Sequence, residues 1–233
     1  MLRLHFDPAS TTCRAIVLFA REEGLEIEYK PLSLQDGDHM QPDFVALNPN
    51  HAVPVLEHDD FVLTESSAIL KYLADLTGSP AYPPGLQARA RVNEAMDWFN
   101  TGFYRDFGHG YVYTQVIDIY HWPDPEQQKV ALQRALSRAE EKLHILDGKL
   151  AATGAFVCGP DISLADYFGA GFVSLALLIN YDLAPYAHVS KWFDRMMLCR
   201  HGLQPTKLSW AGVPRCRQVN SPSGQLRSAA GSA

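Results

Sequence analysis

Residues 2–24 read LRLHFDPASTTCRAIVLFAREEG, a strand-like segment that leads directly into a helix-like one. Apolar and polar side chains alternate over residues 2–6, as they do along a half-buried strand. A polar break follows, and its last three residues, 10–12, carry hydroxyl groups typical of helix caps. Residues 13–23 have apolar side chains at helical spacing, and Gly24 is a typical helix stop. The stretch predicts a β-α unit with a polar corner between strand and helix.

The next fifty residues extend this unit. Residues 27–32 are predicted to be a second strand, which makes a βαβ unit with a parallel crossover. A short helix is expected around Phe44 and Leu47. Two short strands, 53–56 and 61–63, flank an acidic turn and predict an antiparallel hairpin, followed by a helix up to Gly78. Residues 1–78 thus predict the order βαβ-α-ββα.

A Pro-rich segment, 79–85, is predicted to be a linker, and everything after it has a helical pattern. Apolar stripes predict helices at 86–107 and 126–151, and 164–180 is apolar nearly all round, as a buried central helix would be. The fold class is therefore α/β followed by all-α, with a helical bundle over residues 86–211. Residues 212–233 are rich in Ser, Gly, Pro and Arg and are expected to be a mobile tail.

Composition excludes several classes of protein. The chain has 233 residues, is 47% hydrophobic and carries a net charge of −6, so it is long enough for a real core and too acidic for a typical duplex-DNA binder. No apolar run is long enough to span a bilayer, and the N-terminal residues lack the apolar region of a signal peptide, so we expect a cytoplasmic protein. The four cysteines and nine histidines show no metal-ligand spacing, and no metal is expected.

Two corners of the predicted first part could each carry chemistry or serve structure alone. At residues 10–14 a helix start places N–H groups and the helix dipole where an anion would bind, and a hydroxyl could donate to a thiolate there. The alternative is ordinary helix capping by Ser or Thr. At Val53-Pro54 a cis bond would expose the backbone of Val53 to an extended peptide, whereas the alternative is an ordinary proline that opens a strand.

Two further helix starts show the same ambiguity. Ser66 could hold a carboxylate and Glu65 an amino group, or Glu65 could simply compensate the helix dipole. Ser163 and Asp166 are spaced as a capping box, and here the structural interpretation is the favoured one.

In this order, the motifs resemble the glutathione transferase family, most closely its theta and delta classes. The resemblance covers about residues 1–200 and is carried by five segments: STTCRA at 10–15, GDHMQPDF at 37–44, NPNHAVPVL at 48–56, LTESSAILKYL at 63–73 and GPDISLAD at 159–166. It implies a thioredoxin-like N-terminal domain, an all-helical second domain and a glutathione transferase that uses glutathione as co-substrate and no metal.

The resemblance also implies roles for individual residues. Ser10 matches the serine that stabilises the glutathione thiolate, and Thr11 is a second hydroxyl close by. The residues that match glutathione contacts are His39, His51, Val53, cis-Pro54, Glu65 and Ser66. Thr12 and Ala52 depart from the family pattern, in which proline and lysine are frequent at these positions. Cys13 is expected to be a small buried helix residue, because Ser10 stands where a dithiol motif would have its first cysteine.

The second substrate is expected to be a small, largely apolar electrophile bound between the domains. At helical spacing, one polar face of the helix from residue 86 presents Asp97, Thr101, Tyr104, Arg105 and Gly108, and Tyr111 follows in an aromatic stretch. Arg105 could stabilise a leaving group, but a solvated helix face or a packed core explains these residues equally well. The family implies a homodimer with a role in detoxification. A glutathione-dependent dehalogenase or lyase and a non-catalytic interaction module are the alternatives.

Overall fold

A four-stranded sheet forms the base of the N-terminal part. The computed structural model describes residues 1–198. The strands β1 (Leu2–Phe6), β2 (Ile27–Pro31), β3 (Val55–His58) and β4 (Phe61–Thr64) lie in the spatial order β2-β1-β3-β4. β1 and β2 are parallel, and β3 runs antiparallel to both β1 and β4. The predicted parallel crossover and the predicted hairpin are both confirmed.

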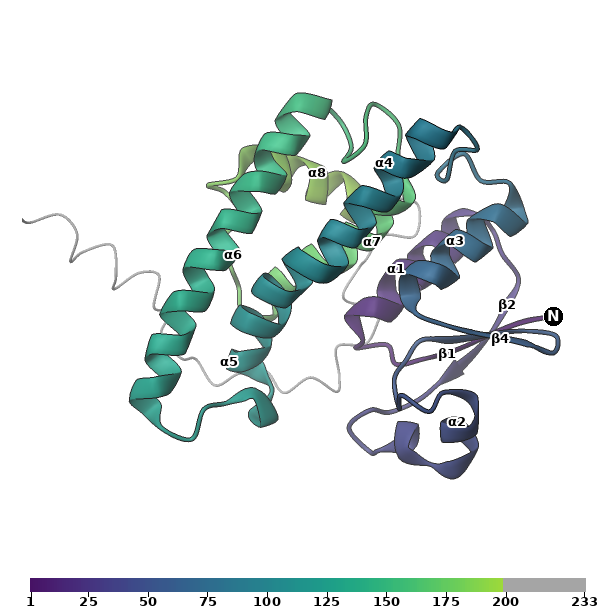
Figure 1. Cartoon of the computed structure of the whole chain (residues 1–233), viewed down its shortest axis with the longest axis horizontal. Coiled ribbons are helices and arrows are strands. Elements are labelled where there is room, and N and C mark those ends of the chain that lie inside the picture. The colour runs from purple at the N-terminus through teal and green to yellow at the C-terminus, as the bar shows by residue number, and fades with distance from the viewer. Residues whose placement is uncertain (199–233) are drawn as a thin grey trace, which may run out of the picture.

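Two helices cover one face of this sheet and separate it from the rest of the chain (Figure 1). They are α1 (Thr11–Glu22) and α3 (Ser66–Thr77), whereas the short 3₁₀ turn Asp38–Met40 and α2 (Pro42–Leu47) lie at one end of the sheet. The strands and the helices both contribute to the core. Leu4 and Leu56 from the strands and Ile16 and Ile69 from the helices are fully buried. The order βαβ-α-ββα is therefore the observed one.

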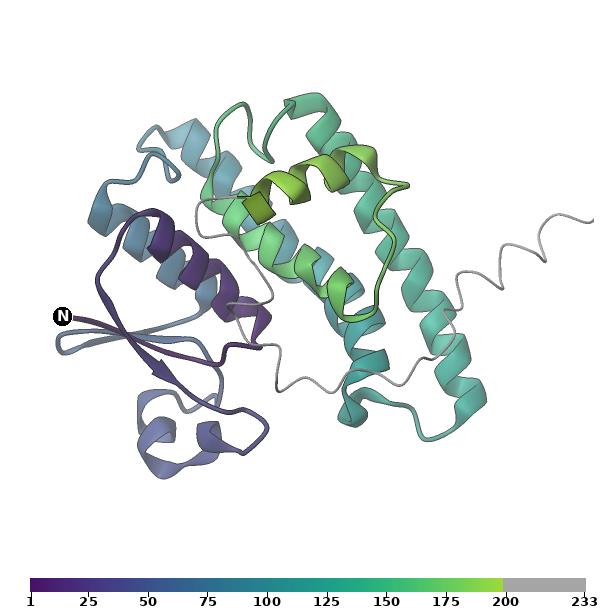
Figure 2. The ribbon, with the colours of Figure 1, turned by 180° about the vertical axis from the view of Figure 1, so that it is seen from behind.

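The rest of the described chain is helical. Its elements are α4 (Leu86–Asp97), a π-helix (Trp98–Tyr113), α5 (Thr114–Val116), a 3₁₀ turn (Asp118–Tyr120), α6 (Pro125–Thr153), α7 (Leu164–Val173), a 3₁₀ segment (Ser174–Leu178) and α8 (Ala187–Leu198). Figure 2 shows α7 and α8 on the side of this part that faces away in Figure 1. The predicted linker falls between α3 and α4, and the predicted tail at 212–233 lies outside the described residues.

Two helices differ from their predicted form. The helix predicted at 86–107 continues as a π-helix from Trp98 to Tyr113, in which backbone hydrogen bonds span five residues instead of four. The helix predicted at 164–180 ends as an α-helix at Val173 and continues as 3₁₀. At this change the Ser174 hydroxyl donates to the Gly171 carbonyl at 2.6 Å, a local bond that competes with a regular helix.

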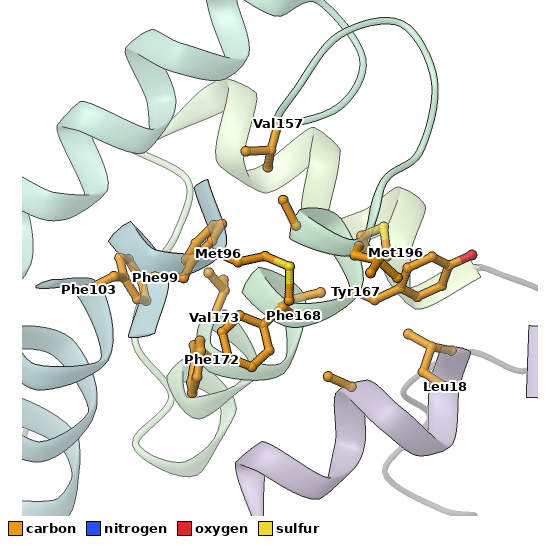
Figure 3. Packing of buried hydrophobic residues seen from close by; sticks show 14 of the residues in the cluster. Leu18, Met96, Phe99, Phe103, Val157, Tyr167, Phe168, Phe172, Val173 and Met196 are labelled. Atoms are coloured by element: carbon orange, nitrogen blue, oxygen red, sulfur yellow. The ribbon is translucent and has the colours of Figure 1, made fainter. Parts of the chain in front are cut away.

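Helix α7 is the centre of the helical part, as its sequence predicts. Every residue from Leu164 to Val173 is buried, and Phe168 and Phe172 belong to one buried cluster with Met96, Phe99 and Phe103 (Figure 3). A Cβ atom on Gly169 would come within 2.3 Å of the Phe99 ring, so only glycine allows this packing. The same helix packs against α1 of the first part.

The start of α7 is held by a buried carboxylate. Asp166 accepts hydrogen bonds from the backbone N–H of Ser163 and of Val157, both at 2.8 Å, and from the Trp192 indole at 2.9 Å. The capping box predicted from Ser163 and Asp166 is present. Within residues 1–198 no helix has the length and apolar character needed to cross a membrane.

Candidate functional site

Three connections meet at one end of the sheet. His5 near the end of β1 pairs with Val55 at the start of β3, and Val55 pairs with Thr64 at the end of β4. The segment after β1, the residues before β3 and the residues after β4 therefore emerge side by side. The topology alone brings Ser10, Val53 and Glu65 to the same end of the sheet, which is called the site edge below.

Ser10 occupies the N-cap position of α1, but its side chain does not cap the helix. Its backbone is extended, with φ −67° and ψ 123°, and within the described chain its hydroxyl makes no bond to the first helical N–H groups. Instead the hydroxyl lies 3.0 Å from the Thr12 hydroxyl. Thr12 Oγ1 in turn donates to the Val53 carbonyl at 3.3 Å. The Ser10 side chain is thus connected to the strand edge at Val53.

Thr11 points elsewhere. Its side chain is buried, and its hydroxyl lies 2.9 Å from the hydroxyl of Tyr113 in the π-helix. The two hydroxyl candidates therefore serve different neighbours: Ser10 faces the Val53 edge, and Thr11 faces the helical part.

A buried cation lies near the start of α1. The Arg14 guanidinium is buried and donates to the Ser174 hydroxyl at 2.8 Å and to the Ala9 carbonyl at 2.7 Å. Burial lowers the pKa of Arg14 to about 10, so it is charged at neutral pH. Cys13 is buried, as its sequence position predicts. Burial raises the pKa of its thiol to about 12, so the thiol is neutral at pH 7. Any thiolate at this corner has to come from a bound molecule.

The other two connections have unusual backbone geometry. The Val53-Pro54 peptide is cis, and both residues are buried. Glu65 has φ +67° and ψ 114°, a strained conformation for a residue with a side chain, and it exposes that side chain. Ser66 is the buried first residue of α3, whose N–H groups and dipole favour a carboxylate. Strained backbone of this kind is concentrated at binding sites.

The two histidines lie in the connection from β2 to β3. His39 is half-buried in the 3₁₀ turn, and among residues 1–198 its Nδ1 atom has no hydrogen-bond partner although the atom is buried. His51 is exposed and has φ +53°. His39 thus has an unused polar atom, and His51 has a solvent-facing ring.

The π-helix rearranges the residues expected at the second-substrate site. The Tyr104 ring stacks on Phe172 with centroids 4.4 Å apart, and Gly108 leaves space for it, because a Cβ there would lie 2.4 Å from Tyr104 Cδ2. Arg105 instead bonds to Asp106 with its Nε at 2.9 Å, and Lys142 of α6 lies 3.8 Å from the same carboxylate. These residues therefore do not share one face, because the expected face assumed α-helical spacing and the segment is a π-helix.

The other three expected residues, Asp97, Thr101 and Tyr111, also lie on different sides of the helix. Asp97 and Thr101 are exposed, and the Thr101 hydroxyl donates to the Asp97 carbonyl at 2.8 Å. Tyr111 is buried and meets Tyr181 edge-on with centroids 5.9 Å apart. Of the expected set, Tyr104 and Gly108 contact each other, and the exposed Asp97 and Thr101 contact each other.

Two residues that sequence reasoning missed, His109 and Tyr120, complete an aromatic cluster with Tyr104 and Tyr113 next to Thr11. His109 lies 4.5 Å from Tyr104 between ring centroids, and the Tyr113 hydroxyl lies 3.1 Å from that of Tyr104. Tyr120 stacks on Tyr113. Burial lowers the pKa of His109, which keeps the ring neutral at pH 7. His109 and Tyr113 follow Tyr104 by five and nine positions, spacings that place residues on different faces of an α-helix. The sequence signal for the cluster was therefore the aromatic richness of the segment.

No group of metal-ligating side chains occurs within residues 1–198. The candidate site consists of hydroxyls, backbone groups, a buried guanidinium and aromatic rings.

Two family models match the two parts of the chain. The family model described as Glutathione S-transferase, N-terminal domain, matches residues 5–75, and the one for the C-terminal domain matches residues 112–198. Glutathione S-transferase theta-1 of Bos taurus is 35% identical over 167 residues, which cover 71% of this chain and 69% of the bovine protein.

Two solved structures show the same fold. A delta-class glutathione transferase of Nilaparvata lugens is 33% identical, has a TM-score of 0.74 and matches over 89% of this chain and 92% of its own. Human glutathione-S-transferase T1-1 in its apo form is 30% identical, has a TM-score of 0.74 and matches over 85% of this chain and 84% of its own. The N-terminal part is thioredoxin-like and the remainder is the family's helical domain. The chain therefore belongs to the glutathione S-transferase family and is a glutathione transferase.

Proposed function

We propose that the Ser10 hydroxyl holds the glutathione sulfur as a thiolate, which then attacks an electrophilic carbon of a largely apolar substrate. One observation carries this proposal: Ser10 stands at the N-cap of α1, yet its hydroxyl is not used as a cap and is directed along the site edge. An ordinary capping serine would bond to the N–H groups of the first turn. The buried Arg14 and the N-terminal end of α1 add positive potential at the same corner.

The energies required are modest. A free thiol with a pKa of about 8.5 is only a few per cent ionised at pH 7. Lowering that pKa by about 2 units requires about 2.7 kcal/mol of differential stabilisation. A charge-assisted hydroxyl bond contributes roughly 1.5–3 kcal/mol and a helix terminus roughly 0.3–1 kcal/mol. Serine and helix together reach the required amount without a metal or a histidine base.

We propose that the rest of glutathione binds along the same sheet edge. Its cysteinyl backbone would pair with Val53 beside Pro54, and its γ-glutamyl end would be held by Glu65 and by the start of α3 at Ser66. The exposed Glu65 carboxylate suits an amino group, and the buried helix start suits a carboxylate. His39 and His51 would contact the glycyl end, and the unpaired Nδ1 of His39 supports its part in this.

The second substrate would bind against the aromatic cluster of Tyr104, His109, Tyr113 and Tyr120. This cluster reaches the glutathione corner through the bond between Thr11 and Tyr113. Its rings and the neutral His109 favour a flat, apolar or aromatic electrophile. Gly108 belongs to this wall through the space it leaves for Tyr104. Arg105, which a carboxylate already neutralises, supports a leaving-group role poorly.

The two substrates would bind to different parts of the chain. Residues 1–78 would bind glutathione, and residues 86–211 would bind the electrophile. The last thirteen of these, 199–211, lie outside the described residues. As the family implies, we propose a homodimer that works in the cytoplasm and serves detoxification. Light scattering on the purified protein tests the dimer.

The experiment for the proposed reaction is steady-state kinetics with glutathione and a chlorodinitroarene, measured for wild type, Ser10→Ala and Thr11→Val. We expect Ser10→Ala to lower kcat/KM about 10- to 100-fold at neutral pH and to recover as pH rises, because free thiolate replaces bound thiolate. Thr11→Val should lose much less. Equal losses in both variants, or none in Ser10→Ala, would contradict the proposed role. Halide and phenol release from alkyl halides and aryl ethers, measured in parallel, separates conjugation from a dehalogenase or lyase.

A further inference from the structure

The Thr12 hydroxyl bridges the two groups to which the proposed function assigns the sulfur and the backbone of glutathione. It lies 3.0 Å from Ser10 Oγ and 3.3 Å from the carbonyl oxygen of Val53. A carbonyl oxygen can only accept, so the single hydroxyl proton of Thr12 goes to Val53. With its proton directed at Val53, Thr12 accepts from Ser10, and the Cys13 side chain is a further hydrogen-bond partner of Ser10.

This direction of bonding has a consequence for the reaction. In the observed arrangement the Ser10 proton is directed at Thr12, and Ser10 has to turn this proton to the sulfur in order to stabilise a thiolate. The Val53 carbonyl is also the group that the cysteinyl N–H of glutathione would approach. A new donor at Val53 competes with Thr12, whose bond there is the longer of its two.

We propose that Thr12 is a positioning residue that reverses its hydrogen bond when glutathione binds. The cysteinyl N–H of glutathione takes the Val53 carbonyl, Thr12 turns its proton to the Ser10 oxygen, and Ser10 donates its own proton to the sulfur. This inference rests on the proposed role of Ser10. Each hydroxyl keeps its proton, so the change is a rotation of two O–H bonds with no proton transfer.

The chain of donors makes Ser10 a better donor than it is alone. A hydroxyl that accepts a hydrogen bond becomes more polarised, so the bond it donates is strengthened. Proline, frequent at this position in the family, has no hydroxyl and cannot act in this way. The Thr12 hydroxyl would therefore add to the serine mechanism at a position where relatives often carry proline.

Two ionisable side chains beside this corner, Cys13 and Arg14, keep one charge state near neutral pH. Burial keeps Cys13 a neutral thiol and Arg14 remains a cation. The Asp7 carboxylate is buried and accepts the N–H groups of Ala9 at 2.6 Å and of Leu34 at 2.9 Å. The ionisation of bound glutathione can thus be followed at this site over the neutral range.

The test is the apparent pKa of the bound glutathione thiol, measured by thiolate absorbance in the ultraviolet. It is compared in wild type, Thr12→Val, Thr12→Ser, Ser10→Ala and the double variant Ser10→Ala/Thr12→Val. Valine keeps the branched shape of threonine and removes the hydroxyl, whereas serine keeps the hydroxyl. Thermal melting checks that each variant is folded, and binding of S-methylglutathione checks the backbone contacts independently of the thiol.

We expect Thr12→Val to raise the thiol pKa by roughly half a unit and Thr12→Ser to restore it. In the Ser10→Ala background the valine substitution should add nothing, because Thr12 acts through Ser10. S-methylglutathione should bind equally well or better, since the Val53 carbonyl loses a competitor.

Three results would overturn the proposal: an unchanged thiol pKa in Thr12→Val, a lowered one, or a rise that persists unchanged when Ser10 is alanine. A lowered pKa would mean that Thr12 only competes for the Ser10 proton. A failure of the serine mechanism itself looks different, because Ser10→Ala would then leave the thiol pKa where it is in wild type.

Discussion

The Thr11 hydroxyl lies 2.9 Å from the Tyr113 hydroxyl, 102 positions further along the chain, so the first helix of the sheet domain is bonded directly to the π-helix of the helical domain. Tyr113 also contacts the Tyr104 hydroxyl at 3.1 Å. The corner that carries Ser10 and the aromatic wall proposed for the electrophile are therefore parts of one hydrogen-bonded structure. Thr11 neighbours Ser10 in sequence, so this bond joins the wall to the helix start that carries Ser10.

The bond between Thr11 and Tyr113 should be measurable as a coupling. Tyr113→Phe leaves the buried Thr11 hydroxyl without this partner and should lower the free energy of unfolding by about 1 kcal/mol. Removing both hydroxyls in Thr11→Val/Tyr113→Phe should cost less than the sum of the two single changes. Urea denaturation gives all three values, and strict additivity would show that the two hydroxyls do not interact.

Two glycines of the π-helix form a matched pair. A Cβ on Gly108 would displace the Tyr104 ring, whereas one on Gly102 meets only the end of the Lys142 side chain at 4.0 Å. Gly108→Ala should destabilise the protein by about 1–3 kcal/mol and raise KM for the electrophile without changing that for glutathione. Gly102→Ala should be neutral or slightly stabilising. An unchanged electrophile KM in Gly108→Ala would remove Tyr104 from the proposed wall.

The buried Asp166 should be essential for the helical domain. Its side chain accepts from the indole of Trp192 and from three donors on Val157 and Ser163, so Asp166→Ala leaves four buried donors without this acceptor. We expect a loss of about 3 kcal/mol or more in unfolding free energy, or failure to fold. Ser163→Ala removes one of these bonds and should lose about 1 kcal/mol. Similar losses in the two variants, compared by thermal melting, would argue against this role.

The stability at acid pH should depend on Asp106. Its hydrogen bonds from Arg105, with a contribution from the charge of Lys142, hold the pKa of Asp106 below its ordinary value. A carboxylate whose pKa is lowered by folding stabilises the protein above its unfolded pKa, about 3.9, and this contribution disappears as pH falls through the folded pKa. The guanidinium of Arg105 is 67% exposed, so the effect is about 1 kcal/mol at most.

Asp106→Asn should therefore show a flatter dependence of unfolding free energy on pH below about pH 4 than wild type. Chemical denaturation at a series of pH values measures both slopes. Parallel curves for the two proteins would show that Asp106 has the same pKa folded and unfolded.

The first domain could be predicted because its elements are short and locally marked. Alternation in residues 2–6 and Gly24 after the first helix define the βαβ unit, and the acidic turn defines the hairpin. The corner residues could be named but not oriented. Ser10 and Thr11 are adjacent hydroxyls in the sequence, and only the packing of Tyr113 against Thr11 separates their directions.

The wall of the second site could not be predicted because its spacing is not that of an α-helix. Tyr104, His109 and Tyr113 meet through a π-helix, and Arg105 turns toward Asp106 and α6 instead. The bridge from Thr12 to Val53 was equally hidden, since it joins residues 41 positions apart across two loops. In both cases tertiary packing, and not local sequence, determined which groups come into contact.

The most direct test of the serine mechanism is the ionisation of glutathione on the enzyme, followed by thiolate absorbance against pH in wild type, Ser10→Ala and Thr11→Val. We expect a bound thiol pKa about 2 units below that of a free thiol in wild type, a rise of about one to two units in Ser10→Ala, and little change in Thr11→Val. An unchanged thiol pKa in Ser10→Ala, or the larger rise in Thr11→Val, would contradict the serine mechanism.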